Sequence, residues 1–228
     1  MTDGAAPLPA ARLFPKRSAV YAGNPLTPAQ LALKRMVDII ISLVALIALL
    51  PLLLAVAILI RLDSPGPVLF TQVRWGRDCC KIRIYKFRSM QIESCDKTGV
   101  AQTRPNDPRI TRIGAVIRRT NIDELPQLLN VLRGDMSLVG PRCHAVGMLA
   151  AGIPYEDLVP DYHRRHSVKP GMTGLAQMRG LRGPTNRAGK ARARIACDLY
   201  YIQHFSILLD LKIMIGTLLN ELRGGKGF

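Results

Sequence analysis

The hydrophobic pattern of this chain is dominated by one continuous apolar segment. Residues 39–60 contain no charged side chain, and a helix of that length rises about 33 Å, enough to cross a hydrocarbon core about 30 Å thick. The segment starts too late and runs too long for a cleavable signal peptide. We therefore predict a membrane anchor over residues 34–62, preceded by a flexible tail of residues 1–33 that is rich in Ala, Pro and Gly.

Two features of this segment bear on how it meets the membrane. Pro51 lies near its middle, where proline removes a backbone donor and bends or breaks a helix. Lys34 and Arg35 precede the segment and Arg61 follows it, so positive charge sets no orientation. A helix–break–helix that enters one leaflet and returns would satisfy both observations. Proline also occurs in helices that cross the bilayer, so a spanning anchor remains the alternative.

Beyond the anchor, the pattern predicts short strands. Residues 68–73 and 82–88 are β-type runs separated by Trp75-Gly76-Arg77-Asp78, which indicates a β-hairpin. Residues 93–108 are polar and are interpreted as a loop. The fold class expected for residues 63–228 is therefore α+β and mainly helical, with one short hairpin.

Three helices are expected after this loop. Ile110, Ile113 and Ile117 recur at helical spacing, and a short apolar helix around residues 125–132 ends at Gly134. A last long helix, with room for a bend, is expected over residues 191–222. Its broad apolar stripe fits a core face, an amphipathic helix at the membrane interface, or the contact surface of a homodimer.

The charge balance points to an anionic partner. Lys and Arg number 32 against 16 Asp and Glu, which gives a formal net charge of +16. Nucleic acid, anionic lipid and phosphate-bearing substrates all fit such an excess. Aromatic residues make up only 5% of the chain and no nucleic-acid-binding motif is recognisable, so we expect no nucleic-acid partner.

The cysteine and histidine spacings predict neither disulfides nor a metal site. The chain has 5 cysteines and 4 histidines, and the sequence shows no CxxC pair and no local Cys/His cluster. This usage suits a reducing cytosol, and we interpret the cysteines mainly as small buried hydrophobic side chains.

The sharpest candidate for chemistry is Asp123-Glu124-Leu-Pro126. Proline is favoured in a first helical turn, so the two carboxylates should lie at or just before a helix start. A carboxylate there can act as a phosphoryl-accepting nucleophile or as a Mg²⁺ ligand. Acidic residues are also common at helix starts for electrostatic reasons alone.

The surroundings of this pair favour chemistry. A site that holds a diphosphate and a metal ion needs carboxylates among cations, and such cations should favour the charged form of both carboxylates. Arg142, in the rigid turn with Pro141, could grip a phosphate or stack on a base. The candidate substrate-binding residues are Lys86, Arg88, Arg109, Arg112, Arg118, Pro141, Arg142 and Lys169.

Several motifs occur in a fixed order along the chain. They are Lys34-Arg-x-x-Asp38, Ser64-Pro-Gly-Pro67, Tyr85-Lys-Phe-Arg-Ser-Met90, Asp107-Pro-Arg-Ile-Thr111, Asp123-Glu-Leu-Pro-Gln127, Gly134-Asp-Met-Ser-Leu-Val-Gly-Pro-Arg142 and Lys169-Pro-Gly-Met-Thr-Gly-Leu-Ala-Gln177. In this combination the chain resembles the bacterial sugar transferases, the monotopic phosphoglycosyl transferases that begin exopolysaccharide, O-antigen and related glycan assembly.

This resemblance implies a place and a mechanism. It implies a re-entrant anchor hinged near Pro51 in the bacterial inner membrane, with the catalytic domain and its amphipathic interface helices on the cytoplasmic face. It implies that Asp123 attacks the β-phosphorus of a UDP-sugar and expels UMP, after which undecaprenyl phosphate takes the sugar phosphate. Glu124 would help to hold Mg²⁺ beside Asp123. Arg118 would bind phosphate, and Pro141-Arg142 would contact the nucleotide.

One position departs from the family pattern, and two other functions stay open. Cys143 stands where the family usually has proline, which loosens the backbone beside the nucleotide contact. The stretch Arg182-Gly-Pro-Thr185 is similar to the corresponding stretch in family members that serve exopolysaccharide synthesis. The alternatives are a non-catalytic membrane-tethered basic module that binds anionic lipid or nucleic acid, and a spanning transferase that forms no covalent intermediate.

Overall fold

The computed structural model of the chain describes residues 27–94, 103 and 107–223. Residues 1–26 of the predicted tail and most of the predicted loop at 93–108 lie outside these ranges. The α-helices are α1 (Pro28–Asp63), α2 (Arg112–Arg119), α3 (Gln127–Arg133), α4 (Tyr155–Leu158), α5 (Leu175–Met178), α6 (Ala188–Gln203) and α7 (Ile207–Leu222). The strands are β1 (Leu69–Trp75), β2 (Lys81–Phe87), β3 (Ser137–Val139), β4 (Leu149–Ala150), β5 (Ile153–Pro154) and β6 (Gly171–Thr173).

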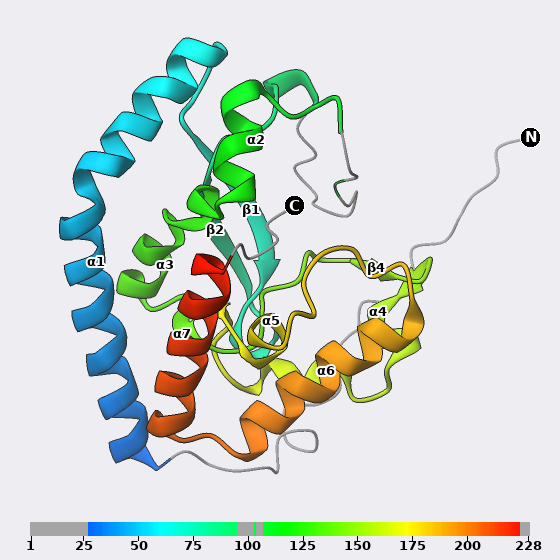
Figure 1. The fold of residues 1–228 in the computed structure, drawn as a ribbon. Coiled ribbons are helices and arrows are strands. Elements are labelled where there is room, and N and C mark those ends of the chain that lie inside the picture. Colours follow the sequence, from blue (N-terminus) through cyan, green and yellow to red (C-terminus); the bar gives the residue numbers. More distant parts are fainter. Residues whose placement is uncertain (1–26, 95–102, 104–106, 224–228) are drawn as a thin grey trace, which may run out of the picture.

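Helix α1 runs along one side of the globular body (Figure 1). It begins within the predicted tail, where Thr27 and Gln30 form a reciprocal capping box: the Gln30 amide donates to Thr27 Oγ1 at 3.2 Å, and the Thr27 amide donates to Gln30 Oε1 at 2.9 Å. The helix continues through Pro51 without interruption. The break expected at this proline is therefore not seen, while α1 has the length and apolar composition of a membrane-crossing helix.

The first turns of α1 are held to the body by charged side chains. Lys34 Nζ donates to Asp210 of α7 at 2.6 Å and to a carbonyl of β3 at 3.0 Å. Arg35 donates to two carbonyls of α3 at 2.5 and 2.6 Å. The Asp38 carboxylate accepts from an amide and a hydroxyl of β3 at 3.0 and 3.1 Å. We call Lys34, Arg35, Asp38 and Asp210 the anchor seam.

The far end of α1 is held by apolar packing. Val56 and Ile60 are buried against Phe87 of β2 and Ile117 of α2. Between the two contacts, the outward face of α1 is apolar and exposed, with Val44 61% exposed and its neighbours on that face similarly open. Both ends of the apolar helix therefore lie against the same globular body.

The predicted hairpin is confirmed. Strands β1 and β2 pair antiparallel from Leu69↔Phe87 to Trp75↔Lys81, and the turn between them contains the short 3-10 helix η2 (Arg77–Cys79). Two further pairs of strands are small: β3 with β6, parallel, and β4 with β5, antiparallel. With helices predominating, this confirms the mixed, mainly helical class.

The two short helices after the loop are also confirmed. The Thr111 hydroxyl caps α2 by accepting from the Gly114 amide at 3.0 Å. Helix α3 ends at Gly134, whose φ of 90° lies in the left-handed region that glycine adopts without a steric cost. Between them, the 3-10 helix η4 (Ile122–Glu124) carries the acidic pair.

The prediction of a single long helix over residues 191–222 is wrong. The chain forms two helices, α6 and α7, which run in different directions (Figure 1). The reason is local: Ser206 has an extended backbone, with φ −155° and ψ 155°, and its hydroxyl accepts from the Leu209 amide at 3.1 Å. Ser206 thus starts a new helix instead of continuing the old one.

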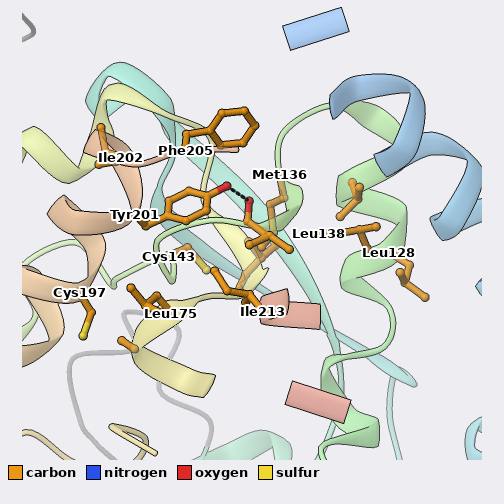
Figure 2. Close-up of a cluster of buried hydrophobic side chains, with 14 residues drawn as sticks. Leu128, Met136, Leu138, Cys143, Leu175, Cys197, Tyr201, Ile202, Phe205 and Ile213 are labelled. Atoms are coloured by element: carbon orange, nitrogen blue, oxygen red, sulfur yellow. Dashed lines mark hydrogen bonds between the residues drawn. The ribbon is translucent and has the colours of Figure 1, made fainter. Parts of the chain in front are cut away.

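The main core joins the hairpin, α3, β3, α5, α6 and α7 (Figure 2). Val131, Met136 and Ile213 are fully buried in it. The hydroxyl of Tyr201 reaches from α6 to the Val139 carbonyl at 3.2 Å, so the buried phenol is hydrogen-bonded. Cys143 and Cys197 pack in the same core, as expected for small hydrophobic side chains.

Candidate active site

A cavity of about 670 Å³ opens between the hairpin, α2, η4, α6 and α7. Charged side chains from all of these elements and from the loops between them face it. Its cations are Arg74, Lys86, Arg109, Arg118, Arg142, Arg165, Arg182 and Arg194, and its acidic residues are Asp123, Glu124, Asp198 and Glu221. The excess of positive charge makes the cavity suited to a polyanionic ligand.

The acidic pair sits at the connection between α2 and α3. Asn121 precedes it with a φ of 55°, a left-handed turn that asparagine tolerates better than most residues, and this turn ends the run of α2. Pro126 then opens α3. The predicted position of Asp123 and Glu124 just before a helix start is confirmed.

Glu124 is held by two cations. Lys86 Nζ donates to Glu124 Oε1 at 2.7 Å, and Arg142 Nη1 donates to Oε2 at 2.9 Å while its Nη2 donates to Oε1. Burial alone would raise the pKa of Glu124, but the charges of Arg142 and Lys86 outweigh it and hold that pKa well below its ordinary value. Glu124 is therefore an ionised group that positions two cations.

Asp123 is in a different state. Its side chain is buried, with 6% of the residue exposed, and within residues 27–94, 103 and 107–223 no group donates a hydrogen bond to its carboxylate. Burial raises the pKa of Asp123 to about 6, against the opposing charge of Lys86. The expectation that nearby cations favour both charged forms is thus correct for Glu124 and wrong for Asp123, where desolvation is the larger effect.

Two further predicted arginines face the cavity. Arg118, on α2, donates to Thr103 Oγ1 at 2.8 Å and to Ser89 Oγ at 3.3 Å. Arg109 is paired with Asp107 through contacts of 2.8 and 2.6 Å. With Lys86 and Arg142, four of the predicted substrate-binding cations therefore line the same cavity as the acidic pair.

The other four predicted residues lie elsewhere. Arg88 is buried under the end of α1, where it donates to the carbonyls of Ser64 and Pro65 and holds the chain that follows this helix. Arg112 is exposed on α2, and Lys169 lies beside Gly134 on the side of the anchor seam. Pro141 does not line the cavity; its carbonyl accepts from the Gly171 amide at 2.9 Å.

The sequence reasoning missed a buried ion pair at the cavity wall. Arg165 Nε donates to Asp198 Oδ2 at 2.9 Å, and both side chains are almost wholly buried. Arg165 Nη2 also donates to the Arg142 carbonyl at 2.6 Å, which fixes the turn that carries Arg142. Residues 164–194 contain nine Lys and Arg and no Asp or Glu, and composition does not tell that Arg165 is the buried one.

The chain matches the bacterial sugar transferase family over residues 29–224. It is 68% identical over 198 residues to an exopolysaccharide production protein of Rhizobium leguminosarum bv. phaseoli, covering 87% of this chain and 99% of that one. It is 45% identical over 194 residues to the UDP-glucose:undecaprenyl-phosphate glucose-1-phosphate transferase of Escherichia coli, covering 85% of this chain. The matched region is 41% of that longer relative.

A third relative differs in the sugar its name gives. The UDP-N-acetylgalactosamine-undecaprenyl-phosphate N-acetylgalactosaminephosphotransferase of Aeromonas hydrophila is 42% identical over 198 residues, which are 87% of this chain and 45% of that protein. The cavity, its acidic pair and the predicted motifs all fall within residues 29–224, which match the family.

Proposed function

Because this chain belongs to the bacterial sugar transferase family, we propose that it transfers a sugar 1-phosphate from a UDP-sugar to undecaprenyl phosphate. The proposed setting is the first membrane step of exopolysaccharide or related glycan assembly. Its support is the similarity to an exopolysaccharide production protein along nearly the whole of that relative, and to transferases named for undecaprenyl phosphate.

The observation that carries the mechanism is the contrast within the acidic pair. Asp123 has a buried carboxylate with no hydrogen-bond donor among the described residues, so its lone pairs are available for attack. Glu124, next to it, holds Lys86 and Arg142 at the same place. A nucleophile among preorganised cations is the arrangement that phosphoryl transfer requires.

The proposed reaction has two displacements. In the first, a carboxylate oxygen of Asp123 forms a bond to the β-phosphorus of the donor, and the bond from that phosphorus to the bridging oxygen breaks with UMP as the leaving group. In the second, an oxygen of undecaprenyl phosphate attacks the same phosphorus, and the acyl-phosphate bond breaks to return the Asp123 carboxylate. Arg142 and Arg118 would bind the phosphate oxygens during both steps.

Mg²⁺ is the proposed cofactor, held by Asp123 and Glu124. The fit rests on oxygen chemistry: the carboxylate oxygens of Asp123 accept no hydrogen bond from the residues that the structure describes. Mg²⁺ is commonly bound by one or two carboxylates plus substrate phosphates. Glu124 can share an oxygen when Arg142 turns toward a bound phosphate. The ion would neutralise charge on the donor diphosphate.

We also propose that the anchor keeps both of its ends on the cytoplasmic side of the inner membrane. The support is the packing of α1, whose polar start and apolar end both lie on the same body. A perpendicular spanning helix would carry one of these contacts to the opposite side of the membrane. The exposed apolar face of α7, with Leu208 78% and Ile215 58% exposed, would lie in the interface.

The deciding experiment is chemical trapping. Full-length protein in lipid nanodiscs is mixed with UDP-glucose carrying a labelled β-phosphate, without lipid acceptor, and quenched rapidly. We expect about one equivalent of UMP per enzyme and an equal amount of protein-bound label mapped to Asp123. Adding undecaprenyl phosphate should transfer the label to lipid.

The matched control is Asp157→Asn, an exposed carboxylate on α4, which should keep the burst, while Asp123→Asn should lose it. Product formation without trapped label would contradict the covalent step and leave the transferase activity standing. UDP-galactose and UDP-N-acetylgalactosamine, run in parallel, would define the sugar.

A further inference from the structure

The fold brings together three side chains that the sequence keeps far apart. Cys79 lies in the hairpin turn, in η2, while His163 and His166 lie on the 3-10 helix η5 (Tyr162–Ser167). The Cys79 Sγ atom is 3.4 Å from Nδ1 of His166 and 3.8 Å from Nδ1 of His163. All three atoms lie within 4.8 Å of one another.

The separation between Cys79 and His166 matches an edge of a metal coordination shell, and the separation between Cys79 and His163 is slightly longer. Zn²⁺ binds thiolate at about 2.3 Å and imidazole at about 2.0–2.1 Å, so tetrahedral geometry places neighbouring ligand atoms about 3.3–3.6 Å apart. We propose that Cys79, His163 and His166 form a Zn²⁺ site that is separate from the acidic pair. The spacing of these residues in the sequence had argued against any such site.

The surroundings of His166 hold its ring in place for this role. His166 is buried against the rings of Trp75 and Tyr162, and its contact with Cys79 is its only polar one among the described residues.

Charge and access also fit a soft divalent cation. The buried cation beside His166 in the sequence, Arg165, is neutralised by Asp198. One thiolate and two imidazoles favour Zn²⁺ over Mg²⁺, which prefers oxygen. Cys79 and His163 are both partly exposed, so an ion can enter from solvent and a water can complete the fourth position.

The bound ion would cross-link two parts of the cavity wall. It would join the hairpin turn to η5, and η5 carries Arg165, whose side chain fixes the backbone at Arg142. We therefore expect zinc to raise the melting temperature of the protein, because an ion that binds only the folded state stabilises it.

The test uses full-length protein in lipid nanodiscs, purified through a tag that contains no histidine. Metal is removed with a chelator, and the protein is titrated with Co²⁺ and then with Zn²⁺. We expect about one equivalent of Co²⁺ with a near-ultraviolet thiolate-to-cobalt band, displaced by Zn²⁺, and a rise in melting temperature on adding Zn²⁺. Cobalt held by carboxylates at the acidic pair would give no such band.

Cys79→Ser should lose the band and the zinc-dependent rise in melting temperature, whereas Cys80→Ser, at the adjacent exposed cysteine, should keep both. Because Cys79 has a left-handed backbone with φ 56°, His163→Gln provides an independent second variant with the same expected loss. An unmodified protein that shows no band, or a band that survives in both Cys79→Ser and His163→Gln, would overturn the proposal.

Discussion

The anchor seam and the acidic pair both bury charge, but they satisfy it differently. In the anchor seam every carboxylate has donors: Asp38 accepts from β3, and Asp210 accepts from Lys34 at 2.6 Å and from the Tyr201 hydroxyl at 2.8 Å. At the acidic pair, Glu124 is equally well satisfied, while Asp123 is buried with no donor among the described residues.

This difference separates a structural site from a reactive one. A buried charge with complete hydrogen bonding stabilises one arrangement of the chain and has little reason to react. A largely buried carboxylate that faces a cavity without a protein donor has a raised pKa, and such a shift is typical of functional sites. The comparison predicts that changes in the cavity reduce turnover and changes in the seam reduce stability.

The largest effect on turnover is expected for Asp123→Asn. The amide is a far poorer nucleophile than the carboxylate, so the rate of UMP release should fall by about 10⁴-fold or more. The melting temperature should not fall, because the substitution removes a largely desolvated charge and breaks no hydrogen bond to the described part of the chain. Retained turnover, measured beside Asp157→Asn, would place Asp123 with the structural carboxylates.

Arg142→Lys should have the next largest effect. Lysine cannot reproduce the paired contacts of the guanidinium with Glu124 or with a phosphate, and we expect turnover to fall by about 10²-fold. The matched variant is Arg119→Lys, at an exposed arginine one position after Arg118, which should keep the original rate. Equal rates for the two variants would remove Arg142 from the site.

The pH dependence should be smaller and should follow Asp123. Its pKa of about 6 means that the reactive carboxylate is present above pH 6 and is protonated below it. The rate of the acceptor-free UMP burst should therefore fall about tenfold per pH unit below pH 6. The burst is the right measurement because it excludes titration of the lipid phosphate. A burst rate that stays unchanged down to pH 4.5 would contradict the raised pKa of Asp123.

The smallest effect on turnover is expected in the anchor seam. Asp38→Ala leaves an amide and a hydroxyl of β3 without their acceptor, so the free energy of unfolding should fall by about 2–3 kcal/mol. Turnover per folded molecule should change by less than about twofold. Chemical unfolding of Asp38→Ala beside Asp157→Ala measures the change in the free energy of unfolding. A loss of turnover without a loss of stability would contradict the assignment of Asp38 to a structural role.

The parts of the fold that could be predicted are those with local signals. Apolar length indicated the long helix α1, alternation indicated the hairpin, and Gly134 marked the end of α3. Pro126 placed the acidic pair at a helix start in the same way. Each of these signals lies within one continuous stretch of sequence, so no knowledge of the tertiary structure was needed.

What could not be predicted depends on tertiary contacts. The sequence shows Asp123 and Glu124 as equivalent neighbours, and only burial and the positions of Lys86 and Arg142 give them different pKa values. Arg88 belongs to the same motif as Lys86, yet it packs under the end of α1 while Lys86 faces the cavity. The sequence alone does not distinguish the roles of these cationic side chains, because each role depends on the partner that the fold brings to it.

The way α1 docks has a practical consequence for producing the protein. Removing residues 28–63 to obtain a water-soluble fragment would uncover Phe87 and Ile117. It would also leave a β3 amide, which donates its hydrogen bond to Asp38, without an acceptor. Such a fragment is expected to aggregate. Solubility is better sought by replacing outward-facing side chains such as Val44 and Ile47, which leaves the docked face of the helix in place.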